Sequence, residues 1–372
     1  MTLLLQLSHE MALRILPVLV VLGSLMVIGT VGNALVVYIF VWRMKVTNQN
    51  YLFAWLGILD LISCTVGIPS EIADICLYYA YENVVACKIM RFCLTVPPVA
   101  SVSVLLVIAV DRYRRVCKPL HVQLHMQHAK VGVAIALVIA LVFALPALSI
   151  YGRRSIDTRI NGVSGFDCSV QDKYQGRLYP LLYEMIFGVA FVSYATSLVV
   201  MYGRIWCETR RHRQYLARHS FSMAPLSSSP TTGDRDSDLP PDDNLPDEAD
   251  DDRGRDRSSS QAEVYTRIRR SLRAQKMTVV ALAVTLVFIL SYLPHLSLIM
   301  IRTTIQHFDS GLSTSGLVAY NIFLRSYFVN SVANVFVYSF MNKEFKDHCK
   351  VIVKRTFGCF SRSNPAQQSY RT

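Results

Sequence analysis

Polar side chains occur inside long apolar stretches of this sequence, where each is costly to bury in lipid. They are Asn33, Asp60, Ser101, Asn330 and Asn334, and the triplet Asp111-Arg112-Tyr113 that ends one stretch. A carboxylate in an apolar interior needs a compensating charge, and a guanidinium keeps its charge while it exchanges partners. Such residues usually face the interior of a helix bundle and work there. The sequence holds no phosphate-binding glycine loop, zinc-binding histidine pair or paired catalytic carboxylates, so nothing in it supports an enzyme.

The apolar stretches are long enough to cross a bilayer. The chain has 372 residues, of which 52% are hydrophobic and 17% charged, whereas soluble domains are about 25% charged. A membrane-spanning helix needs about 20 mostly apolar residues, and seven segments reach or approach that length. Backbone amides in lipid must be hydrogen-bonded internally, so these segments are expected to be helices. We therefore predict an all-α membrane protein, a seven-transmembrane helix bundle.

The predicted bundle covers residues 15–341 and follows a short extracellular N-terminus, 1–14. Its helices are expected at 15–42, 50–78, 84–117, 129–151, 179–207, 267–303 and 314–341. A short amphipathic eighth helix is predicted at 342–357, before a cytoplasmic tail at 358–372. One face of it carries Phe345, Cys349, Ile352 and Val353, and the other carries Lys343, Lys346, Lys350 and Lys354. This pattern suits a helix on an anionic membrane surface, with an ordinary solvated helix as the alternative.

The distribution of charge predicts the orientation. With the N-terminus outside, the segments left inside hold most of the 38 lysine and arginine residues, in agreement with the positive-inside rule. Topology thus explains the net charge of +12, and no nucleic-acid partner is expected. The longest inside segment, 208–266, has an acidic centre rich in proline and serine and is predicted to be largely disordered. Its basic flanks are expected to extend the fifth and sixth helices.

Five motifs stand in order on the expected helices. They are Gly32-Asn33, the Leu-x-x-x-Asp that ends at Asp60, Asp111-Arg112-Tyr113, the segment from Phe288 to Pro294, and the segment from Asn334 to Tyr338. With the motifs in this order, the chain resembles the class A, rhodopsin-like G-protein-coupled receptors. Within that class its general features resemble those of the neuropeptide receptors. The resemblance implies a multi-pass plasma-membrane receptor with a cytoplasmic C-terminus and an extracellular ligand. Its implied intracellular partners are a heterotrimeric G protein, arrestin and a receptor kinase, with membrane lipids around it.

The resemblance also implies roles for single residues. A coupling and activation switch comprises Asp111, Arg112, Tyr113, Tyr202, Phe288, Tyr292, Pro294, Asn334 and Tyr338. A polar core that can hold a sodium ion comprises Asn33, Asp60, Ser101, Asn330 and Asn334. A hydrogen-bonded cluster without an ion is the alternative, and no other cofactor is expected. Many relatives carry an acidic residue where Ala274 stands, so noticeable basal signalling is predicted.

Some positions depart from the family pattern. Tyr292 and Ala136 stand where relatives carry tryptophan, and Tyr194 and Val335 where they carry proline. The third helix instead contains a Pro97-Pro98 pair, which is expected to kink it at the depth of the ligand pocket.

The resemblance pairs two of the nine cysteines. Cys87 and Cys168 match the family's extracellular disulfide, which closes a loop over the pocket. Cys76 and Cys93 lie near the same side and remain alternative partners. Cys359, after the amphipathic helix, is a candidate for palmitoylation, with an unmodified thiol as the alternative.

The ligand is predicted from the outer ends of the helices. Leu94 stands where amine receptors carry an aspartate, and residues 314–341 lack the lysine that retinal needs. The expected pocket residues are Glu71, Asp74, Arg91, Leu94, Glu184, His295, Arg302, Tyr320 and Arg325. Charges of both signs suit a short peptide, although each could instead extend toward the lipid headgroups. A small non-peptide or lipid ligand is the alternative, and a transporter or channel a remote one.

Overall fold

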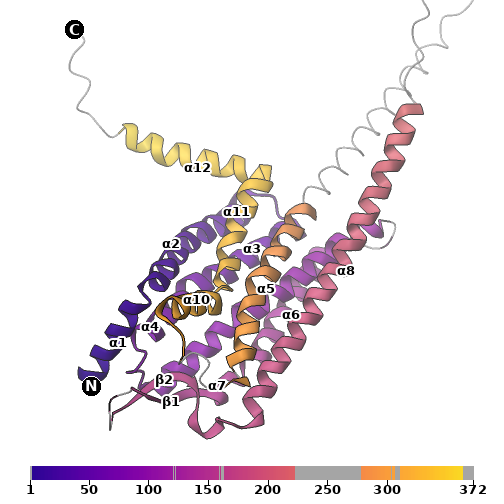
Figure 1. Cartoon of the computed structure of the whole chain (residues 1–372). Helices are drawn as coiled ribbons and strands as arrows, with labels where there is room; N and C mark the ends of the chain where they lie inside the picture. The colour runs from indigo at the N-terminus through magenta and orange to yellow at the C-terminus, as the bar shows by residue number, and fades with distance from the viewer. Residues whose placement is uncertain are drawn as a thin grey trace, which may run out of the picture.

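The computed structural model describes residues 2–119, 121, 123–158, 160, 163–222, 278–302, 304–305 and 311–362. Among these residues, six helical stretches are long and apolar enough to cross a membrane: Leu16–Arg43, Asn48–Cys76, Val84–Cys117, Met126–Ile150, Leu178–Arg211 and Thr278–Arg302. They lie side by side in an elongated bundle (Figure 1). The predicted helical membrane bundle is therefore present, and its seventh span is divided into two shorter apolar helices.

The spans differ in how they are built. The first consists of α2 (Leu16–Tyr38) and a π-helical turn (Ile39–Arg43), and the second of α3 (Asn48–Ile62), a π-helical turn (Ser63–Gly67) and α4 (Ile68–Cys76). The third is α5 (Val84–Cys117), one continuous helix with Pro97 and Pro98 inside it. The fourth is α6 (Met126–Ala144) followed by the single turn α7 (Ala147–Ile150), and the fifth lies within α8 (Leu178–Ser222).

Side-chain caps fix where several helices begin. Thr47 accepts a hydrogen bond from the amide of Asn50 at the start of α3, and Asn83 accepts one from the amide of Ala86 at the start of α5. Each cap satisfies an amide that has no partner within its helix. The two helices therefore start close to the boundaries expected from the apolar pattern.

The prediction of one continuous seventh helix over 314–341 is wrong. The chain forms α10 (Thr314–Leu324) and α11 (Phe328–Met341), with Arg325, Ser326 and Tyr327 in the break between them. Ser326 donates a hydrogen bond to a backbone carbonyl of the neighbouring helix Thr278–Arg302. Such bonds to other helices compensate for those lost at the break. The sequence has neither glycine nor proline at this point to signal it.

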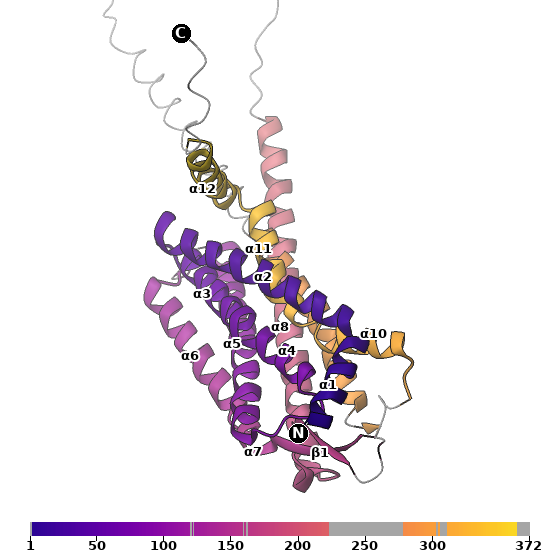
Figure 2. The same cartoon turned by 90° about the vertical axis from the view of Figure 1, so that its left-hand side faces the viewer.

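The loop between the fourth and fifth helices contains structure that the apolar pattern did not predict. Strands β1 (Tyr151–Asp157) and β2 (Ser164–Val170) pair in antiparallel register, with Arg153 opposite Cys168. The fourth helix therefore ends before Tyr151, which was predicted to be its last residue. Figure 2 shows β1 at the same end of the bundle as the N-terminus.

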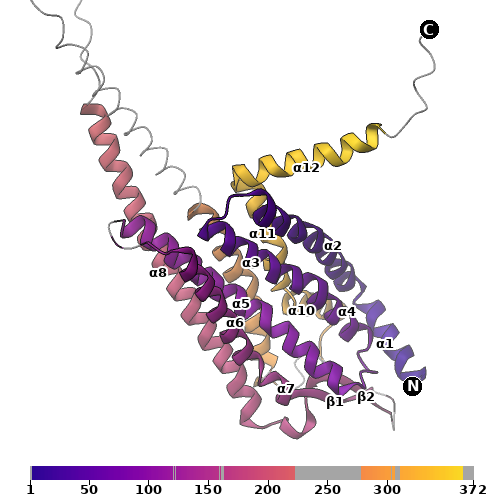
Figure 3. The ribbon, with the colours of Figure 1, turned by 180° about the vertical axis from the view of Figure 1, so that it is seen from behind.

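Helices at the two ends of the chain and after the fifth span also differ from expectation. The predicted N-terminal segment 1–14 contains a helix, α1 (Thr2–Arg14), which packs against α4. Helix α8 continues to Ser222, so the helical part of the 208–266 loop is longer than predicted. Helix α12 (Lys343–Arg362) runs beyond 357, and Cys359 lies within it rather than after it. It projects sideways at the end of the bundle opposite the strands (Figures 1 and 3).

Helix α5 occupies the centre of the bundle. It packs against α3, α6 and α8, and its residues Val104, Leu105 and Ile108 are almost fully buried. By contrast, α2 and α8 expose many valines and leucines on their outer faces. Exposed apolar surface of this extent suits contact with lipid rather than water.

Candidate functional site

A large cavity opens at the end of the bundle that carries the strands. Its volume is about 1350 Å³, and its walls come from α4, α5, α8, the helix Thr278–Arg302, the helix 7 break and the strand hairpin. Of the predicted pocket residues it is lined by Glu71, Asp74, Arg91, Leu94, Glu184, His295, Arg302 and Arg325. Tyr320 is buried in α10 and does not line it.

Four charged residues form an ionic cluster at the cavity wall. Glu71 accepts hydrogen bonds from Arg91 at 3.1 Å and from Arg325 at 2.8 Å, and Arg91 also pairs with Asp74 at 2.8 Å. Arg325 donates in addition to the side chain of Asn321, at 2.7 Å. The cluster joins the second, third and seventh spans, and its two carboxylates balance its two guanidinium groups. Its charges therefore need no counter-ion from a ligand.

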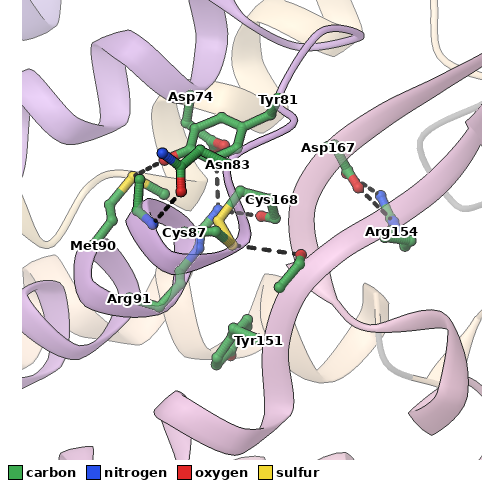
Figure 4. Close-up of a disulfide and its surroundings, with 12 residues drawn as sticks. Asp74, Tyr81, Asn83, Cys87, Met90, Arg91, Tyr151, Arg154, Asp167 and Cys168 are labelled. Carbon is green, nitrogen blue, oxygen red and sulfur yellow. Dashed lines mark hydrogen bonds and ion pairs between the residues drawn. A yellow bond between two sulfur atoms is a disulfide. The ribbon is translucent and has the colours of Figure 1, made fainter.

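The disulfide predicted from the family pattern is confirmed, since Cys87 and Cys168 are bonded to each other. Cys76 and Cys93 carry free thiols. Arg91 donates to the backbone carbonyl of Cys168 at 2.7 Å, so the ionic cluster and the disulfide hold the same point of β2 (Figure 4). This double attachment fixes the hairpin over one side of the cavity.

Glu184 lies on the cavity wall formed by α8, apart from the ionic cluster. Its carboxylate accepts a hydrogen bond from the hydroxyl of Tyr151 at 2.9 Å. Burial raises the pKa of Tyr151, which keeps its phenol a neutral donor. Tyr151 was not predicted as a site residue, because no local pattern indicates that the chain folds back into a strand there.

The helix 7 break forms part of the cavity floor. The ring of His295 contacts the ring of Tyr327, with centroids 4.6 Å apart, and its Nδ1 is hydrogen-bonded to the carbonyl oxygen of Leu324. Ser326 donates to the carbonyl of Ser291 at 2.6 Å. The break is thus attached to the sixth span by two side-chain hydrogen bonds.

Helix α1 supplies cavity residues that sequence reasoning missed. Leu7, Glu10, Met11 and Arg14 line the mouth of the cavity. The backbone amide of Tyr79 donates to the hydroxyl of Ser8 in α1 at 3.0 Å. These four residues repeat at helical spacing, which is the one signal in the sequence that could have identified this face.

The predicted polar core lies deeper in the bundle. Asp60, Ser101, Asn330, Asn334 and Asn33 are all buried. Asn334 donates to the carboxylate of Asp60 at 2.8 Å, and Asn33 donates to the carbonyl of Ser331 at 2.8 Å. Ser331, which was not predicted, is buried in the same helix as Asn330 and Asn334. Among the described residues, the side-chain oxygens of Asn330 and Asn334 have no hydrogen-bond partner, so oxygen ligands suited to a sodium ion are available beside one carboxylate.

The opposite end of the bundle carries the predicted switch residues. Asp111 and Arg112 form a buried ion pair at 2.6 Å, and Arg115 adds a second bond to Asp111 at 2.9 Å. Tyr202 and Tyr338 are buried nearby in the same hydrophobic core. Tyr113 is half-buried against that core.

Two further switch residues, Phe288 and Tyr292, line the cavity, and their rings are in contact. The ring of Phe288 lies 4.7 Å from that of Tyr292, and Tyr292 lies 6.0 Å from Tyr327 of the helix 7 break. Pro294 stays within the continuous helix Thr278–Arg302. The position of Ala274 and the side chain of Cys359 lie outside the described residues.

Comparisons with known proteins agree with this architecture. The sequence pattern of the family described as "7 transmembrane receptor (rhodopsin family)" matches residues 32–338. The chain is 26% identical to the neuropeptide S receptor of Mus musculus over 208 residues, which is 54% of each chain. It is 29% identical to olfactory receptor 14J1 of Homo sapiens, over 51% of this chain and 59% of the relative. It is 32% identical to the C3a anaphylatoxin chemotactic receptor of Oncorhynchus mykiss, over 40% and 42%. The chain spans about half the length of these curated relatives.

Proposed function

Because the chain belongs to the rhodopsin family of seven-transmembrane receptors, we propose that it is a plasma-membrane receptor for a short peptide. The bound peptide activates a heterotrimeric G protein at the opposite end of the bundle. The observation that carries this proposal is the cavity of about 1350 Å³, lined by charged residues of both signs. A cavity that exceeds the usual range of about 300–1,000 Å³ for small-molecule sites has room for several peptide residues.

The relatives support the same class of ligand. Two of the three compared proteins are named as receptors for neuropeptide S and for the C3a anaphylatoxin. The ionic cluster and the polar hairpin give the cavity hydrogen-bonding groups on several sides, which suit a backbone with many donors and acceptors. The match to an olfactory receptor instead favours the alternative, a small non-peptide ligand.

The test is a screen in transfected cells. A library of short neuropeptides is applied while calcium and cyclic nucleotides are recorded, and the matched control is Arg112→Ala expressed at the same surface level. We expect at least one peptide pool to give a response that the control lacks. Responses confined to small non-peptide or lipid ligands would favour the alternative, and ion flux without nucleotide exchange would indicate a transporter or channel.

A sodium ion in the polar core is part of this proposal. Asp60 supplies the carboxylate, and the buried oxygens of Ser101, Asn330 and Asn334 lie on neighbouring helices. Bound sodium would stabilise the arrangement in which Asp60 stays charged. Replacement of Asp60 by Asn is expected to abolish any dependence of basal nucleotide exchange on sodium, with potassium at equal ionic strength as the control. Unchanged sodium dependence would contradict it.

The cytoplasmic assignments complete the proposal. The N-terminus and the hairpin lie outside, and α12 lies on the inner leaflet, with Phe345 packed against the bundle and Lys346 and Lys350 exposed. Cys359 is proposed as a palmitoylated residue that holds α12 on the membrane. Arrestin and a receptor kinase are proposed partners of this same face, as in the family at large.

A further inference from the structure

Two sets of charged residues in the inner cavity wall differ in how their charges are balanced. Glu71, Asp74, Arg91 and Arg325 neutralise one another within the ionic cluster. Glu184 forms no ion pair with any lysine or arginine in the part of the chain that the structure describes. The cavity therefore holds one carboxylate on α8 whose charge is balanced by no direct contact.

The contacts of Glu184 orient its carboxylate without an ion pair. Tyr151 donates a hydrogen bond to one carboxylate oxygen, Oε1, and so orients the group. The guanidinium of Arg91 lies 5.8 Å from the centre of the Tyr151 ring and forms its ion pairs with Glu71 and Asp74. Arg302 and Arg91 both act on Glu184 electrostatically, but within the described residues neither forms an ion pair with it. The other carboxylate oxygen, Oε2, accepts no hydrogen bond from the residues that the structure describes and remains able to accept one.

A partly buried carboxylate without a bonded cation is unfavourable for stability. Proteins retain such groups where they bind a partner of opposite charge, because a charge-assisted hydrogen bond is about twice as strong as a neutral one. Resting on the proposed function, we propose that Glu184, oriented by Tyr151, binds a cationic group of the ligand, an arginine or lysine side chain or a terminal ammonium. The ligand class is thereby narrowed to basic peptides.

The test uses two small probes that differ only in charge. N-acetyl-arginine amide is cationic, and N-acetyl-citrulline amide is its neutral counterpart with nearly the same shape. The melting temperature of the purified full-length chain in detergent is measured with each probe at about 10 mM, a concentration suited to the weak affinity of a single contact. The chloride concentration is the same in both samples. We expect the arginine probe alone to raise the melting temperature, by about 1 °C or more. Equal shifts with both probes, or no shift with either, would overturn the proposal.

Two variants test whether the shift in melting temperature depends on Glu184. Glu184→Gln keeps an oxygen that accepts from Tyr151 and removes the charge, so the shift with the arginine probe should disappear. Glu10→Gln makes the same change at an exposed acidic residue of the cavity mouth, and the shift should remain. Persistence of the shift in Glu184→Gln would overturn the proposal. The comparison of the two probes on the unaltered chain decides the question even where a variant fails to fold.

The unliganded variants provide an independent readout. Glu184→Gln removes an unbalanced charge and is expected to raise the melting temperature, whereas Glu71→Gln breaks two ion pairs and is expected to lower it. A fall in Glu184→Gln as large as that in Glu71→Gln would show that Glu184 is a structural partner, and would overturn the proposal. A charge-selective shift without any response in the peptide screen would support this inference and contradict the proposed receptor function.

Discussion

Asp111 accepts hydrogen bonds from Arg112 and Arg115 and is 2% exposed, so its carboxylate holds both guanidinium groups at the end of α5. Arg112 is almost as deeply buried, and within the described residues its only ion pair is with Asp111. Release of Arg112 would therefore leave a buried cation free to bind a new partner. The proposed switch at this end of the bundle would rest on this property of Arg112.

Replacement of Asp111 by Asn is expected to raise basal nucleotide exchange. The variant loses a charge-assisted hydrogen bond worth about 1.5 kcal/mol, which corresponds to roughly a tenfold shift between resting and active states. Binding of a non-hydrolysable GTP analogue to membranes without ligand measures the change. Asp347→Asn, at an exposed residue of α12, should behave as the unaltered chain does. Unchanged exchange in Asp111→Asn would contradict a locking role for the pair.

Replacement of Glu71 by Gln is expected to destabilise the whole bundle. It leaves Arg325 and Arg91 short of a buried counter-charge, and breaking such a pair costs about 3–5 kcal/mol. A melting curve of the purified chain in detergent measures the loss, against Glu82→Gln at an exposed loop position as the matched control. A melting temperature equal to that of the control would show that the ionic cluster contributes little.

The sequence identified most of these charged residues but not their pairing. Glu71, Asp74, Arg91 and Arg325 were predicted as separate pocket residues because each ends an apolar stretch. Their pairing depends on where each helix ends and on the break at Arg325, which has no local sequence signal. Tyr151 was missed for a related reason, since its contact with Glu184 exists only because the disulfide brings the hairpin back over α8.

At the scale of helices, small residues set the distance between neighbours. A Cβ atom added at Gly57 of α3 would lie 2.8 Å from the side chain of Val36 on α2, which is closer than atoms can pack. At Gly203 of α8 the added atom would meet nothing within 4 Å. The first and second spans can therefore approach only where glycine stands.

This contrast gives a matched pair of variants. Gly57→Ala should lower the melting temperature and the amount of chain at the cell surface, because the two helices must separate or shift. Gly203→Ala adds the same methyl group in open space and should raise helix stability by up to about 1 kcal/mol. Melting in detergent and surface labelling measure both. Equal behaviour of the two variants would contradict the close packing of α2 and α3.

The apolar pattern of the sequence predicts where helices occur, but it does not predict where they are interrupted. The continuous course of α5 and the division of α10 from α11 are opposite to what proline content suggests: α5 contains two prolines, and the break contains none. At the break, the hydrogen bond from Ser326 to Ser291 on the neighbouring helix compensates for bonds lost within the seventh span. A local pattern carries no information on those neighbours.

At the scale of the molecule, the hairpin and the N-terminus mark one end of the bundle, and α12 marks the other (Figure 2). An epitope tag placed before residue 2 is expected to be labelled on intact cells. A tag inserted near residue 250 should be labelled only after permeabilisation, since positively charged flanks remain inside. Immunofluorescence with both tags in the same chain measures the orientation. Labelling of the internal tag on intact cells would contradict it.

The interruption of the seventh span has a mechanical consequence. Arg325 is bonded to Glu71 on one side of the break, and Ser326 is bonded to Ser291 on the other. The break is therefore held between the second and the sixth spans. A ligand that separated Arg325 from Glu71 would remove the first of these attachments and allow the angle between α10 and α11 to change. Helix α11 runs from the break toward the end of the bundle opposite the cavity and carries Asn334 and Tyr338. A change in one side-chain contact beside the cavity would thereby be transmitted to the opposite end of the molecule, because α11 would move as a rigid body.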